Sequence, residues 1–171
     1  MGKFGFGSHE VPADENEGSQ RQMEAAIGLY IAGAEVGKID GDFDENERKA
    51  LSGHMMAIAA NSKSRFVADA ALLCARWEEM RDIYNQDKRS HRDHLSDLSQ
   101  LIQKLPNEDK YRYIIAFCST TRVVGDASGG GWFNSEKFSE DEKKVAIAMW
   151  NTLFNRSNLE DSIAWVQQYG K

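Results

Sequence analysis

Residues 66–84 read FVADAALLCARWEEMRDIY, and this stretch decides the fold class. Its apolar side chains recur at alternating steps of four and three residues, at Phe66, Ala70, Leu73, Trp77, Met80 and Tyr84. That spacing places them along one side of a helix, so it predicts a single helix over 66–84 that is buried along this side. We expect Trp77, in the middle of the stripe, to lie in the core.

The same spacing recurs before and after this stretch. An earlier stripe runs over 23–34 and is followed by Gly37, which can take the left-handed geometry of a helix C-terminus. Later stripes lie at 91–105, 111–124, 145–153 and 159–166, and Pro106 with Asn107 separates the first two of these. No alternating strand pattern is present in the sequence. It therefore predicts an all-α fold, a single compact bundle of about seven helices.

Capping boxes, in which a short side chain and a longer one satisfy each other's backbone amides, mark helix starts. Four pairs fit the pattern: Ser19 with Gln22, Asp44 with Glu47, Ser139 with Glu142, and Ser157 with Glu160. A second helix is expected from about Asp44 to about Ala60. Residues 1–18 are predicted to be a flexible N-terminal tail, and residues 19–171 to be one helical domain.

The net charge of −6 is unevenly distributed. Residues 35–47 hold six acids and one base, and residues 126–142 hold five acids and one base. The acidity is therefore local, whereas a generally solubilising surface would have spread it out. The basic spot formed by Lys88, Arg89 and Arg92 is too small for a nucleic-acid interface.

Other features of the composition bear on location. No segment approaches the roughly 20 apolar residues that cross a bilayer, so no membrane insertion is expected, although peripheral association is compatible with the sequence. Cys74 and Cys118 lie in apolar helical patterns and are expected to be buried free thiols. A cytoplasmic location is the expectation that follows.

The two acidic segments belong to an internal repeat. FDENERK at 43–49 aligns with FSEDEKK at 138–144, and each follows a Val-Gly pair, at 36–37 and 124–125. The repeated unit is a helix, Val-Gly, an acidic loop, Phe and a capped helix. The second loop is longer and includes Gly129–Phe133, which we interpret as a flexible insertion whose aromatic pair docks on the body or contacts a partner.

The segment DGDFDENE at 40–47, with its weaker copy around Asp126 and 138–142, resembles the tellurite-resistance TerB family. It is also similar to the related N-terminal domain of membrane-anchored DnaJ-like proteins. The resemblance implies an all-α bundle with a pseudo-two-fold repeat and a cytoplasmic or membrane-peripheral location. It further implies a role in the response to chemical stress, with no established catalysis.

Alternating acids at Asp40, Asp42 and Asp44 begin like an EF-hand loop. Glu45 then stands where glycine is needed and Leu51 where the bidentate Glu should be, which excludes a standard EF-hand. A looser site for a divalent cation such as calcium or magnesium is the metal hypothesis. Its ligands are predicted to be Asp40, Asp42, Asp44 and Glu47, with Asp126 and Glu142 as their counterpart. The alternative is that these acids only cap helices.

His91 and His94 lie three residues apart and share one helix flank. Two such histidines can form half of a metal site, and the alternative is a partly exposed helix start capped by Ser90. Nucleophile motifs are not recognisable in the sequence. The first functional hypothesis is therefore a non-catalytic binding or stress-response module of the TerB type, which senses or scaffolds through its acidic face and whose partner is another protein. The alternatives are a small metal-dependent enzyme that uses the acidic loops, and a pure interaction scaffold without an ion.

Overall fold

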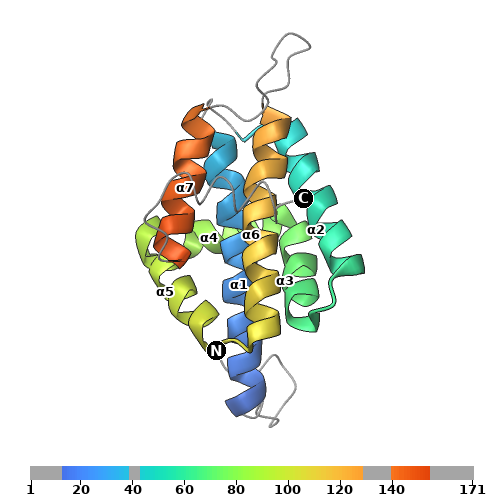
Figure 1. Cartoon of the computed structure of the whole chain (residues 1–171), viewed down its shortest axis with the longest axis vertical. Coiled ribbons are helices and arrows are strands. Elements are labelled where there is room, and N and C mark those ends of the chain that lie inside the picture. Colours follow the sequence, from blue (N-terminus) through green and yellow to red (C-terminus); the bar gives the residue numbers. More distant parts are fainter. Residues whose placement is uncertain (1–12, 39–42, 129–139, 155–171) are drawn as a thin grey trace.

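The computed structural model describes residues 13–38, 43–128 and 140–154, and it is an all-α bundle (Figure 1). The described residues form helices joined by short connections and include no strand. The helices are α1 (Ala13–Gly37), α2 (Glu45–Asn61), α3 (Arg65–Ala75), α4 (Trp77–Gln86), α5 (His91–Lys104), α6 (Asn107–Ser128) and α7 (Glu140–Phe154). The predicted fold class is confirmed.

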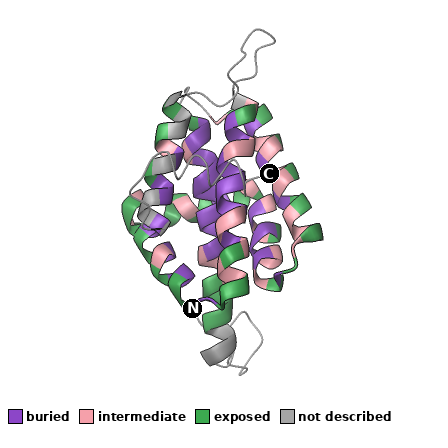
Figure 2. Ribbon diagram, viewed as in Figure 1, coloured by how far each residue is buried: buried purple, intermediate pink, exposed green. Residues whose placement is uncertain are grey.

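Helix α1 is the central element of the bundle. It packs against each of the six other described helices, and α6 lies across it in the middle of the molecule (Figure 1). Every residue of 25–34 is buried, and the buried residues gather along α1 and α6 (Figure 2). A helix that is covered on all sides needs apolar residues on all sides, and AAIGLYIAGA at 25–34 provides them.

The close approach of α5 and α6 to α1 depends on Gly28. The hydroxyl of Tyr113 in α6 donates a hydrogen bond of 2.7 Å to the carbonyl of Ala25, and Tyr113 is fully buried. A Cβ atom added at Gly28 would overlap that hydroxyl and the side chain of Leu98 in α5. The glycine therefore lets α5 and α6 pack onto the same turn of α1.

The helix predicted over 66–84 is in fact two helices. Arg76 has a ψ angle of 66° and separates α3 from α4. The prediction of one continuous helix is therefore wrong. Trp77 is only half-buried, which corrects its expected place in the core. Its ring lies against the guanidinium groups of Arg48 and Arg81, at 5.0 Å and 5.3 Å from the ring centroid. The break is one residue long, so the spacing of the apolar residues in the sequence is unaffected by it.

Other boundaries differ from the sequence analysis. Helix α1 begins at Ala13, so 13–18 are helical and Ser19 is an interior position instead of a cap. Helix α6 continues through Gly125 to Ser128. The sequence predicts about seven helices, and the described residues form seven. The two sets differ, because α3 and α4 replace one predicted helix and the helix predicted around 159–166 lies outside the described residues. The Gly129–Phe133 segment also lies outside them, and the pseudo-two-fold relation stays a prediction.

The packing at Gly28 predicts opposite effects for two glycine-to-alanine changes. Gly28→Ala should lower the free energy of unfolding by about 1–3 kcal/mol, because the added methyl group overpacks the α1–α5–α6 contact. Gly53→Ala is the matched control, since this exposed position in α2 has no atom within 4 Å of an added Cβ. It should raise the free energy of unfolding by about 0.5–1 kcal/mol through helix propensity. Urea titrations measure both, and a stabilising Gly28→Ala would contradict the packing described above.

Candidate functional site

The predicted metal ligands lie only partly within the described residues. Asp40 and Asp42 fall outside them, and so does the side chain of Glu142. Asp126 is exposed near the end of α6. Among the described residues, no three or more His, Cys, Asp or Glu side chains are grouped so that they could hold a metal ion. The convergence of the two acidic segments therefore stays a prediction.

Asp44 and Glu47 form the predicted capping box at the start of α2. The Glu47 amide donates to Asp44 Oδ1 at 2.8 Å, and the Asp44 amide donates to Glu47 Oε1 at 3.1 Å. Glu47 is nevertheless buried, and an added Cβ at Gly37 would overlap its carboxylate and the ring of Phe43. This contact joins the end of α1 to the start of α2.

His94 is buried, which the sequence did not predict. Ser90 caps α5 by accepting from the Asp93 amide at 3.1 Å, as expected, but His94 is 1% exposed. Its ring lies 5.0 Å from that of Tyr84, centroid to centroid. Its Nδ1 is 4.0 Å from Glu24 and its Nε2 is 3.8 Å from Asp87, and neither nitrogen is hydrogen-bonded. The expectation of a partly exposed helix start is wrong for this residue.

Arg89 links three parts of the chain beside His94. Its guanidinium donates to Glu24 in α1 at 2.8 Å, to Asp97 in α5 at 2.9 Å, and to Asp87 between α4 and α5 at 2.7 Å. These hydrogen bonds hold the pKa of Asp87 well below its usual value and raise that of Arg89. We call Glu24, Asp87, Arg89 and Asp97 the Arg89 cluster. In the sequence Arg89 is only one member of a small basic spot, because Glu24, which joins the cluster to α1, is 65 positions away.

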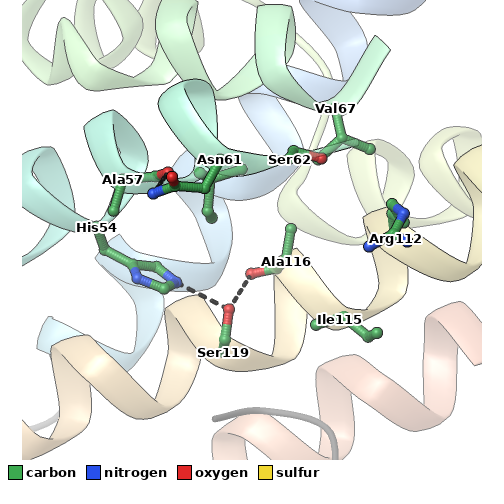
Figure 3. A pocket seen from close by; sticks show the side chains of 10 residues that line it. His54, Ala57, Asn61, Ser62, Val67, Arg112, Ile115, Ala116 and Ser119 are labelled. Atoms are coloured by element: carbon green, nitrogen blue, oxygen red, sulfur yellow. Dashed lines mark hydrogen bonds between the residues drawn. The ribbon is translucent and has the colours of Figure 1, made fainter. Parts of the chain in front are cut away.

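A groove with a volume of about 320 Å³ lies between α2 and α6 (Figure 3). We call it the α2–α6 groove. Its lining is formed by His54, Ala57, Ile58, Asn61 and Ser62 on the α2 side, by Val67 of α3, and by Arg112, Ile115, Ala116 and Ser119 of α6. Each of the two long helices contributes residues at i, i+3, i+4 and i+7, which is one helical face.

The two faces run antiparallel along the groove. His54 meets Ser119 at one end, where Nε2 and Oγ are 2.8 Å apart (Figure 3). Beyond the other end, Ser64 donates to Asp109 at 2.7 Å. Residue numbers therefore increase along α2 in the direction in which they decrease along α6. These two contacts fix the register of the walls, and Arg112 lies toward the second end.

The His54–Ser119 contact has the residue types of a nucleophile and its base, but its geometry favours a structural role. The Ser119 hydroxyl also lies 3.1 Å from the carbonyl of Ala116, to which it donates. Burial lowers the pKa of His54, so the ring is neutral near pH 7 and can donate to Ser119 through Nε2. Ser119 lies in the interior of α6, where the backbone amides are used within the helix and cannot bind an oxyanion.

The half-buried His54 and the buried His94 predict that acid destabilises the protein. Burial lowers the pKa of His54, and burial followed by the charge of Arg89 lowers that of His94, both from an ordinary value of 6.5. Just below that value the unfolded chain binds more protons than the folded one, so the free energy of unfolding falls as pH falls. Urea titrations between about pH 7.5 and pH 5.5 should show this slope around the histidine pKa. His54→Gln and His94→Gln should each reduce it, and an unchanged slope in both variants would contradict the assignment.

The acidic segment makes a separate prediction about Asp44. Asp44→Ala should cost about 1 kcal/mol by removing the cap of α2, whereas Asp44→Asn should keep most of it. If the cation hypothesis holds, calcium or magnesium raises the melting temperature of the wild type. The double variant Asp40→Asn with Asp44→Asn should lose that rise. A wild-type melting temperature that no divalent ion changes would decide for helix caps alone.

Comparisons with known proteins add no relative. The chain matches no protein-family model, no curated protein and no solved structure. Among the described residues, none of the helices has both the length and the apolar character needed to cross a membrane. The similarity to the TerB family therefore rests on the sequence motifs alone and stays a prediction.

Proposed function

We propose that this chain is a non-catalytic binding module of the TerB-like type, acting in the response to chemical stress. Its binding site in this proposal is the α2–α6 groove. The sequence resemblance supports the family and the stress-response role. The groove supports binding, since a concave site with apolar walls and a few polar groups is what small-molecule sites have in common.

One observation carries the proposal: the α2–α6 groove leaves apolar side chains accessible between two helices that otherwise pack together. Ile58, Val67 and Ile115 contribute apolar surface to it, and polar groups lie toward both ends. Ile58 and Ile115 are half-buried, so part of each side chain is left for a ligand to cover. Covering such surface is favourable by about 25 cal/mol per Å².

Binding is favoured over catalysis by the state of the polar groups. His54 and Ser119 are hydrogen-bonded to each other, and Ser119 also donates to the carbonyl of Ala116. A catalytic serine needs its proton directed to the base and oxyanion donors beside it. These side chains therefore serve to shape the end of the groove. In this proposal a divalent cation on the acidic segments is a separate ligand, and a partner protein a separate contact.

A neutral apolar probe tests the groove directly. Titration of the labelled full chain with 1-octanol should shift the backbone amide signals of groove residues. Ala57→Trp should weaken this binding about tenfold, a loss of about 1.4 kcal/mol, because the indole fills the groove. Ala60→Trp is the matched control, since Ala60 is also exposed on α2 but does not line the groove. Octanol binding that is equal in both variants, or shifts confined to another surface, would refute the proposal.

A further inference from the structure

We propose that the α2–α6 groove selects small amphipathic carboxylates, with the apolar body along its walls and the carboxylate on the Arg112 guanidinium. This inference rests on the proposed function, because it names the ligand class of the same site.

The shape of the groove suits an elongated apolar body. Its walls extend over eight residues of each helix, from His54 to Asn61 and from Arg112 to Ser119, and the seven steps between them span about 10 Å at 1.5 Å per residue. Between those limits the lining is apolar, at Ala57, Ile58, Val67, Ile115 and Ala116. A short alkyl chain or a single aromatic system can lie along such a slot.

The ends of the groove are chemically different. At one end His54 and Ser119 are paired and neutral near pH 7. Toward the other end Arg112 is the single ionised side chain among the described residues of the lining, and none of those residues is acidic. The site therefore places one guanidinium at the end of an apolar slot, with the Glu108 carboxylate outside the lining as its partner. That arrangement matches a ligand with one negative charge at one end.

Arg112 has hydrogen-bonding capacity left for a ligand. Its Nε donates to Glu108 at 2.6 Å, one turn earlier on α6. Its two terminal nitrogens make no hydrogen bond to any other described residue. The planar guanidinium binds a carboxylate through two parallel N–H groups, which a point charge cannot do. Arg112 is about one-third exposed and its partner Glu108 about two-thirds, so a ligand can reach the terminal nitrogens.

Glu108 competes with the ligand for the same cation, and this gives the proposal two variants of opposite sign. Removing the positive charge with Arg112→Gln should abolish the preference for an acid. Removing the competing carboxylate with Glu108→Gln should strengthen it. The Glu108 carboxylate is about two-thirds exposed and lies one turn from Arg112, and a pair of this kind contributes little to stability, so both variants should fold.

The test compares octanoate, 1-octanol and octylamine, which share one alkyl chain and differ in the head group. Each is titrated into the labelled full chain near neutral pH and low salt, and affinities are read from the amide signals of groove residues. We expect octanoate to bind about five- to tenfold more tightly than octanol, and octylamine to bind more weakly than octanol. Arg112→Gln should make octanoate and octanol equal, and Glu108→Gln should increase the octanoate preference severalfold.

The possible failures are distinguishable. Equal binding of octanoate and octanol to the wild type at groove residues would overturn the ligand class while leaving the proposed groove in place. Preferential binding of octanoate that survives Arg112→Gln and ignores Glu108→Gln would overturn the assignment to Arg112. If none of the three compounds shifts the groove signals at millimolar concentration, the proposed function fails as well.

Discussion

The covering of helix α1 on all sides is the constraint on which the rest of the structure depends. A helix can contact six neighbours only where its side chains are small or apolar, and the stretch 25–34 meets this condition. Gly28 admits Leu98 and Tyr113 to the same turn, and the Tyr113 hydroxyl satisfies a buried carbonyl of α1. The position of α6 follows from this contact. The α2–α6 groove is in turn set by the position of α6, because α6 forms one of its two walls.

Polar contacts of the Arg89 cluster also connect the helices. The Arg89 cluster joins α1 to α5 and to the α4–α5 connection through charge-assisted hydrogen bonds. Arg89 is only one-third exposed, so these bonds are better sheltered from solvent than an ordinary surface ion pair. His94 lies behind the cluster with both ring nitrogens unpaired, which costs stability that the surrounding apolar burial must offset. The same shelter explains why acid should act on this part of the bundle.

Much of the fold could be predicted from local sequence patterns. Helical periodicity gives the all-α class, and the Asp44–Glu47 capping box gives the start of α2. The interruption at Arg76 could not be predicted, because a break of one residue leaves the apolar spacing unchanged. Ser19 was misleading for a related reason, since a capping pattern inside a continuing helix looks the same as one at its start. Boundaries therefore depend on packing that the local sequence does not contain.

The candidate site was less predictable than the fold. The sequence directed attention to the acidic segments, and two of the predicted ligands, Asp40 and Asp42, lie outside the described residues. His54 and Ser119 are 65 positions apart, so only the antiparallel packing of α2 and α6 brings them together. A weak signal was available, because His54 shares a helical face with Ala57 and Ile58, and Ser119 with Ile115 and Ala116. The pattern alone gave neither residue a partner.

Native-state hydrogen exchange tests the central role of α1 most directly. Amides of residues 25–36 should exchange only through complete unfolding, with an exchange free energy equal to the global value from urea titration. Amides on the exposed side of α2 should exchange through smaller openings. If residues 25–36 exchanged with a lower free energy than those of α2, α1 would not be the element around which the bundle and its groove are built.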